Sequence, residues 1–85
     1  MVRGDGAEEG LIEIGMLWFD NDPKRDLPAK VQRAADYYRG KYGREPTVCE
    51  VNPSEGKVPE RVGLISLVRS VRVLRSHLWL GTEEA

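Results

Sequence analysis

The chain has 85 residues, with 13 Lys and Arg against 14 Asp and Glu and 40% hydrophobic residues. This length leaves room for one hydrophobic core, so two domains are excluded, and the near-neutral charge with ordinary apolar content disfavours disorder. One Cys and one His are too few for a disulfide framework or a Cys/His zinc site. No apolar run approaches the roughly 20 residues that span a bilayer. We therefore expect a cytoplasmic protein without a membrane partner.

The N-terminal part of the chain changes character at residue 11. Residues 1–10 contain three glycines and three acidic residues, and they predict a flexible acidic lead-in. Residues 11–19 are rich in β-forming residues and end at turn-forming residues 20–23, so they predict the first strand. Their near-continuous apolar character indicates that both faces are covered or that a partner protects one edge. We expect a single compact domain over residues 11–81 and a frayed tail over residues 82–85.

A helix is predicted over residues 27–42. Asp26 is a good N-cap, Pro28 falls in the first turn, and Gly43 with Pro46 is typical of a helix end. Six apolar residues share one helical face, which we expect to pack on the sheet: Leu27, Val31, Ala34, Ala35, Tyr38 and Tyr42. Gly40, inside the last turn, indicates either a close approach by another element or fraying.

Residues 47–51 predict a second strand, so the first half of the domain is a strand, a helix and a strand. If these strands lie parallel in one sheet, a right-handed crossover is expected. Residues 61–81 have apolar residues at helical spacing, but no N-cap precedes Val62 and Gly63 would fall in the first turn, which favours strands. We predict an α+β domain in the order β-α-β-β, with room for one more strand, in which one helix packs on a three- to four-stranded sheet.

Several short motifs lie along residues 16–81. In chain order they are LWFDND at 17–22, Lys30, Ala34-Ala35, Tyr37-Tyr38, KYG at 41–43, Pro46, Cys49, VNP at 51–53 and HLWLG at 77–81. This pattern resembles a family of small bacterial proteins of unknown function. The resemblance supports the element order and a strand near the C-terminus, and it implies no chemistry.

Two groups of residues have spacings found in metal sites. Asp20 and Asp22 provide oxygen ligands at alternate positions, but an EF-hand loop counted from Asp20 lacks the Gly and Glu required at its sixth and twelfth positions. Glu55 and Lys57 have the spacing found in metal-dependent nucleases, with Asp20 or Asp22 as a second carboxylate, yet they lie in a predicted loop. We favour a structural turn for the aspartates. A metal-dependent hydrolase is kept as a remote alternative.

Cys49 and His77 are the residues that best suit nucleophilic catalysis. Nothing in their spacing requires a nucleophile and base, and a lone Cys on a strand is typically a small buried hydrophobe. We expect His77 to be a half-exposed strand residue that shapes a turn or contributes to binding. We therefore predict no catalytic residue, no metal and no cofactor, and we expect that the chain is not an enzyme.

Two surfaces are candidates for binding. The first, the basic helix stripe, has residues at intervals of three or four on the predicted helix: Lys30, Arg33, Tyr37, Lys41 and Arg44. It is suited to phosphates and to base stacking, or it is simply a solvated face. The second is an aromatic interface comprising Trp18, Phe19, His77 and Trp79, because one helix cannot easily cover all the apolar residues of so small a chain.

Our leading functional hypothesis is a non-enzymatic interaction module. It binds a protein, or a second copy of itself as a homodimer, through the edge of its sheet and the aromatic interface. The alternative is a nucleic-acid-binding module that uses the basic helix stripe.

Overall fold

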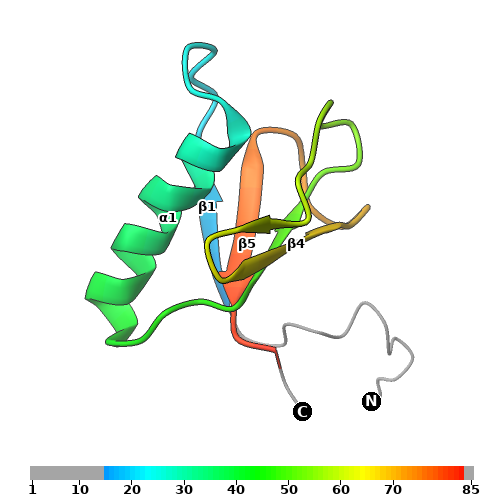
Figure 1. The fold of residues 1–85 in the computed structure, drawn as a ribbon. Helices are drawn as coiled ribbons and strands as arrows, with labels where there is room; N and C mark the ends of the chain where they lie inside the picture. The colour runs from blue at the N-terminus through cyan, green and yellow to red at the C-terminus, as the bar shows by residue number, and fades with distance from the viewer. Residues whose placement is uncertain (1–14, 84–85) are drawn as a thin grey trace.

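One helix packs against one face of a mixed β-sheet in the computed structural model, which describes residues 15–83 (Figure 1). The elements are β1 (Gly15–Phe19), α1 (Leu27–Tyr42), β2 (Val48–Val51), β3 (Arg61–Val62), β4 (Ile65–Arg69) and β5 (His77–Gly81). The α+β class is confirmed. Within residues 15–83 the sheet has five strands, in the order β1-β5-β2-β4-β3, so the predicted count of three or four is wrong. The extra strand is β3, which turns back on β4 at Gly63, where φ is 62°.

The strands on either side of α1 in sequence are not neighbours in the sheet. β5 lies between β1 and β2 and is antiparallel to both, so β1 and β2 run parallel to each other. β2 also pairs parallel with β4. The C-terminal strand therefore links the two halves of the domain.

The limits of α1 agree with its predicted capping residues. The Asp26 carboxylate accepts a hydrogen bond of 3.0 Å from the amide of Ala29. Gly43 adopts a left-handed φ of 74°, and its N–H donates to the carbonyl of Arg39 at 2.9 Å. A Cβ placed on Gly40 would have no neighbour within 4 Å, so no close approach requires a glycine there.

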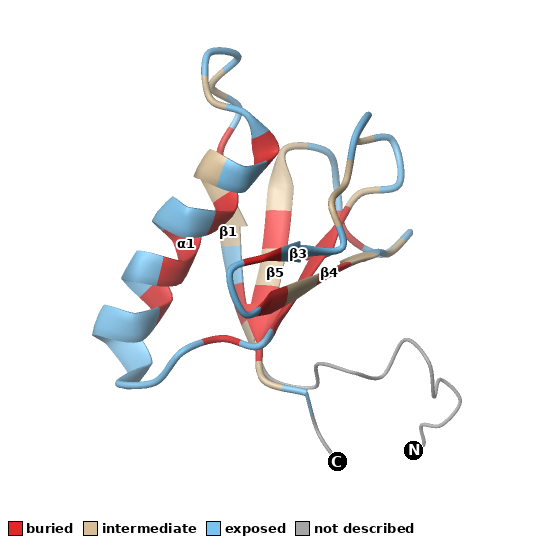
Figure 2. Cartoon of the chain, in the orientation of Figure 1, coloured by how far each residue is buried: buried red, intermediate tan, exposed pale blue. Residues whose placement is uncertain are grey.

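The core lies between α1 and the sheet. The helix face with Val31, Ala34 and Tyr38 is buried against Cys49 and Leu80 of the sheet, while the outer face of α1 is exposed (Figure 2). The predicted apolar face is therefore confirmed from Leu27 to Tyr38. Tyr42, in the last turn, is 43% exposed.

The prediction of strands within residues 61–81 is confirmed, with an ordered loop over residues 70–76 between β4 and β5. The predicted lead-in, residues 11–14 of the predicted first strand, and residues 84–85 lie outside the described residues. In the described part of the tail, the amide of Glu83 donates to the hydroxyl of Thr47 at 3.0 Å. Within residues 15–83, no helix has both the length and the apolar character needed to cross a bilayer.

Candidate interaction surface

The face of the sheet opposite α1 is called the open face here. Its residues follow from the strand registers, in which Leu17 lies opposite Trp79 and Trp79 lies opposite Glu50, while Phe19 lies opposite His77. Leu17 and Phe19 are 59% and 58% exposed. Among the described elements no helix covers this face, so β1 presents two large apolar side chains to solvent.

The loop of residues 70–76 makes a hollow on the open face. The hollow has a volume of about 330 Å³ and is lined by Leu17, Arg72, Val73, Leu74, His77 and Trp79. Leu74 is 69% exposed at the rim, whereas Val73 is 3% exposed and anchors the loop. A concave site lined mainly by apolar side chains with a few polar groups is typical of surfaces that receive an apolar side chain.

An ion pair between a buried carboxylate and a half-exposed guanidinium holds the loop against the sheet. Arg72 donates from Nε to Oε1 of Glu50 at 3.1 Å and from Nη2 to Oε2 at 3.0 Å. Glu50 is only 2% exposed, although it occupies a central strand, and Arg72 covers it from the solvent side. Asn52 adds a hydrogen bond of 2.6 Å from Nδ2 to the carbonyl of Val73. The wall of the hollow is therefore fixed before any ligand arrives.

His77 and Phe19 form one end of the open face. Their ring centroids are 5.0 Å apart with an interplanar angle of 52°. Nδ1 of His77 lies 2.8 Å from the carbonyl oxygen of Arg75, and a hydrogen bond there requires the proton on Nδ1. This bond fixes the ring and leaves Nε2 for a ligand.

The predicted aromatic interface is divided between the two faces of the sheet. Phe19, His77 and Trp79 lie on the open face, but Trp18 faces α1, and its ring centroid is 5.3 Å from that of Tyr37. Nε1 of Trp18 is buried without a hydrogen-bond partner among residues 15–83. Adjacent strand residues point to opposite faces, so Trp18 and Phe19 cannot share one surface.

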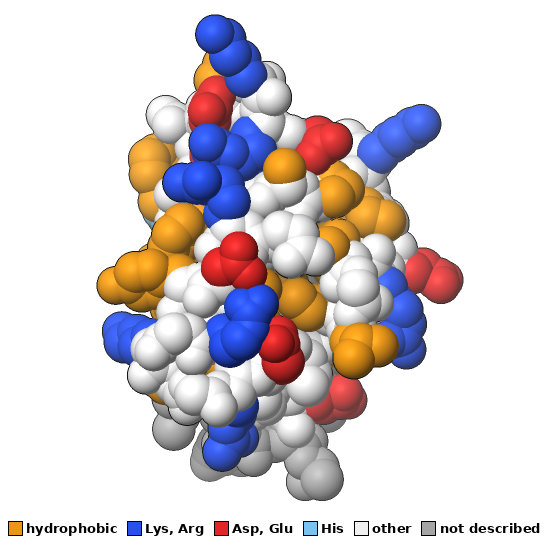
Figure 3. All heavy atoms as spheres, turned by 60° about the vertical axis from the view of Figure 1, so that its left-hand side comes forward, with side chains coloured by type: hydrophobic (Ala, Val, Ile, Leu, Met, Phe, Trp, Pro, Cys, Tyr) orange, Lys and Arg blue, Asp and Glu red, His pale blue; other side chains and the backbone are white. Residues whose placement is uncertain are grey.

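Four residues of the basic helix stripe, Lys30 to Lys41, lie on α1, on a surface where basic and acidic side chains alternate (Figure 3). Arg44 follows the C-cap Gly43 and is therefore outside the helix. Asp36 and Glu45 are both paired with Arg39, at 2.8 Å and 2.7 Å. Across the described part of the chain, four cations of the stripe form no ion pair: Lys30, Arg33, Lys41 and Arg44. The stripe therefore keeps its charge available beside Tyr37, which is 56% exposed.

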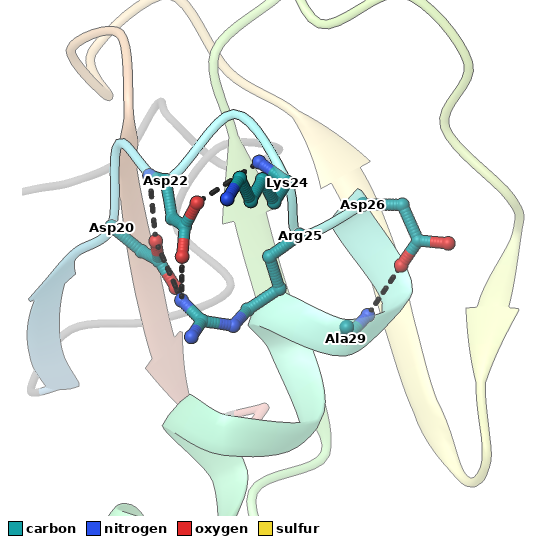
Figure 4. Close-up of polar contacts among 6 residues, drawn as sticks. All are labelled: Asp20, Asp22, Lys24, Arg25, Asp26 and Ala29. Atoms are coloured by element: carbon teal, nitrogen blue, oxygen red, sulfur yellow. Dashed lines mark hydrogen bonds and ion pairs between the residues drawn. The ribbon is translucent and has the colours of Figure 1, made fainter.

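Asp20 and Asp22 build the turn before α1 (Figure 4). Oδ1 of Asp20 accepts from the amide of Asp22 at 3.0 Å, and Nη1 of Arg25 lies 3.0 Å from Oδ2 of Asp20 and 3.4 Å from Oδ2 of Asp22. Burial acts to raise the pKa of Asp20, but the Asp22 amide, Arg25 and Lys30 outweigh it and lower the pKa below 3.8. The two carboxylates face a guanidinium, as a structural turn requires.

The residues that best suit catalysis are not brought together by the fold. Cys49 is buried on the helix face, whereas His77 lies on the open face. Burial, with a smaller contribution from Glu50, raises the pKa of the Cys49 thiol to about 12. Glu55 and Lys57 line a groove beside the start of α1. In the portion of the chain that the structure describes, no group of three or more His, Cys, Asp or Glu residues is placed to hold a metal ion.

Comparisons of the chain with protein-family models, with curated proteins and with solved structures find no match. The resemblance to a family of small bacterial proteins stays a prediction. The sequence pattern does not mark Leu17, Glu50, Arg72 or Leu74 as binding residues. A charged residue inside the apolar strand 48–51 was the available signal for Glu50, because a buried carboxylate requires a partner.

Proposed function

We propose that this chain is a non-enzymatic interaction module that binds a protein partner through the open face of its sheet. The observation that carries the proposal is the preformed apolar hollow beside Leu17 and Phe19. These side chains and Leu74 are more than half exposed on adjoining parts of one surface. Contiguous exposed apolar surface around a concave centre is the usual mark of a protein-binding site.

The chemistry of the hollow favours an apolar side chain of the partner. Its apolar lining comes from Leu17 and Trp79 of the sheet and from Val73 and Leu74 of the loop. Arg72 is already engaged with Glu50, so its guanidinium supports the wall. A leucine or phenylalanine side chain would replace water in the hollow without breaking that ion pair.

An amide NMR titration with N-acetyl-leucine amide tests this proposal, with N-acetyl-lysine amide as the polar control. We expect millimolar leucine probe to shift the amides of Leu17, Val73 and Leu74 and the indole of Trp79, and the lysine probe to leave them unchanged. Leu74→Lys should abolish the shifts. Leu64→Lys is the matched control, because Leu64 is 83% exposed and lies outside the hollow. Equal shifts with both probes, or no shift at the hollow, would reject the proposal.

A second candidate function, binding of nucleic acid, is favoured by the four unpaired cations of the basic helix stripe. Phosphate contacts would come from these cations, while Tyr37 offers one ring face for stacking. The test is a titration with a pool of short RNA and DNA at low and moderate salt. Salt-sensitive shifts over residues 30–44 that the double substitution Lys30→Glu and Arg33→Glu removes would support this candidate. No shift at low salt would reject it for these ligands.

A further inference from the structure

The two edges of the sheet differ in how far they are protected. β3 forms one edge, and it has only two residues and follows Pro59 closely. β1 forms the other edge, and within residues 15–83 it pairs with β5 alone. Its sequence Gly-Met-Leu-Trp-Phe contains no charge and no proline. Short strands, charges and prolines are the usual protections of an edge, and β1 has none of them.

The backbone groups on the outer edge of β1 can be assigned from the hydrogen bonds of the sheet. The amide of Asp20 donates to the carbonyl of Ser76 at 2.9 Å, which directs the backbone groups of Asp20 toward β5. Direction alternates along a strand, so Met16 and Trp18 also bond toward β5, and Gly15, Leu17 and Phe19 direct their N–H and C=O groups outward. The amide of Thr47 donates to the carbonyl of Gly81 at 2.9 Å, so this carbonyl of β5 points away from β1. Gly15, which lies opposite Gly81, therefore makes no bond to that carbonyl, in agreement with the assignment.

We propose that a second copy of this chain pairs with β1 in antiparallel orientation, about a two-fold axis at Leu17. Leu17 would face Leu17 of the partner subunit, and Phe19 would face Gly15 of the partner subunit. This register brings the three outward residues of each strand opposite three outward residues of the other, with about six backbone hydrogen bonds between them. If the two strands were shifted by one residue, the outward N–H and C=O groups of one strand would face residues whose groups point away. If they were shifted by two residues, only two of the three outward residues of each strand would find a partner.

The side chains fit the same register. Leu17 and Phe19 carry their side chains on the open face, and Gly15 has no side chain. The large ring of Phe19 would therefore lie beside Gly15 of the partner subunit, where no side chain competes for space. A two-fold axis at such a pair is perpendicular to the sheet, so the open faces of both copies would lie on one side and both helices on the other. The inference rests on the proposed function, and it names the partner as a second copy that extends the open face.

Hydrogen exchange of the wild-type protein tests the edge without any substitution. In the dimer the amides of Leu17 and Phe19 gain protection as the protein concentration rises, whereas those of Met16 and Trp18 are protected at every concentration. Slow exchange of Leu17 and Phe19 at low concentration, or fast exchange at high concentration, would overturn the pairing. Association through the open face alone would not make the protection of alternate amides of β1 depend on concentration.

Sedimentation equilibrium of two Leu17 variants separates the edge from the face. Leu17→Ala removes the side chain and keeps the N–H, so we expect roughly tenfold weaker dimerisation. Leu17→Pro also removes the outward N–H, which occurs twice at the axis, so we expect roughly 100-fold weaker dimerisation or its complete loss. Leu17→Pro should keep the far-UV circular dichroism of the wild type, because its N–H makes no bond to β5.

The outcomes distinguish this inference from the proposed function. A dimer that Leu17→Pro and Leu17→Ala weaken equally, or a wild-type protein that stays monomeric to about 1 mM, overturns the edge pairing. In either case, N-acetyl-leucine amide could still shift the amide NMR signals of the residues that line the hollow, and this result would support a protein-binding face. Leu17→Cys gives a positive test, since paired Cα atoms about 5.5 Å apart allow a disulfide across the axis. Leu64→Cys is the control and should not cross-link at the same concentration.

Discussion

Arg72→Met removes the guanidinium that covers Glu50 and keeps an unbranched apolar side chain in its place. Glu50 is 2% exposed, so the substitution leaves a buried carboxylate without its two hydrogen bonds from Arg72. Removing one partner of a fully buried ion pair costs about 3 to 5 kcal/mol. The side chain of Arg72 is 45% exposed, so water reaches the vacated position and the cost falls to about 2 to 3 kcal/mol. For a domain of this size that corresponds to a fall in Tm of roughly 10 to 20 °C.

Thermal and urea unfolding of four proteins measure this effect: wild type, Arg72→Met, Glu50→Leu and the double variant. We expect the double variant to recover most of the loss, because an apolar pair can replace a buried ion pair. Arg39→Met is the matched surface control, since its partners Asp36 and Glu45 are both exposed, and it should cost less than about 1 kcal/mol. A loss for Arg72→Met as small as that of Arg39→Met would refute the reasoning, as would a double variant less stable than either single variant.

Three further predictions concern the turn, the core cysteine and the helix end. Folding lowers the pKa of Asp20 below 3.8, so its carboxylate stabilises the protein above pH 3.8 and this contribution is lost as the pH falls through the folded value. The difference in urea midpoint between wild type and Asp20→Asn should therefore be present at neutral pH and disappear in acid, and a constant difference would contradict this. With a pKa of about 12, the Cys49 thiol should resist iodoacetamide in the native protein and react only in urea, whereas alkylation at equal rates would show that it is accessible. Gly40→Ala should raise the free energy of unfolding by about 1 kcal/mol, because Gly40 lies inside the helix with space for a Cβ. Gly43→Ala should lower it by a similar amount, because Gly43 has a left-handed φ of 74° that strains an alanine. Changes of the same sign in urea unfolding would refute that assignment.

Local interactions explain which parts of the fold were predictable. The limits of α1 depend on Asp26 and Gly43, whose effects act within one turn of the helix. The structural turn at Asp20 likewise involves residues at most five positions away. In each case the interacting groups are neighbours in sequence, so residue type and spacing were sufficient.

The candidate interaction surface depends on contacts between distant parts of the chain. Glu50 and Arg72 are 22 residues apart, and the pairing of both β4 and β5 with β2 places the loop that joins them beside Glu50. The near-continuous apolar run through β1 contains no alternation from which the faces of Trp18 and Phe19 could be assigned. By itself the sequence determined the helix, its caps, the strand character of the C-terminal segment and the turn at Asp20. Tertiary structure alone decided the sheet order, the fifth strand, the exposed edge and the composition of the open face, because strand pairing joins residues without regard to their distance along the chain.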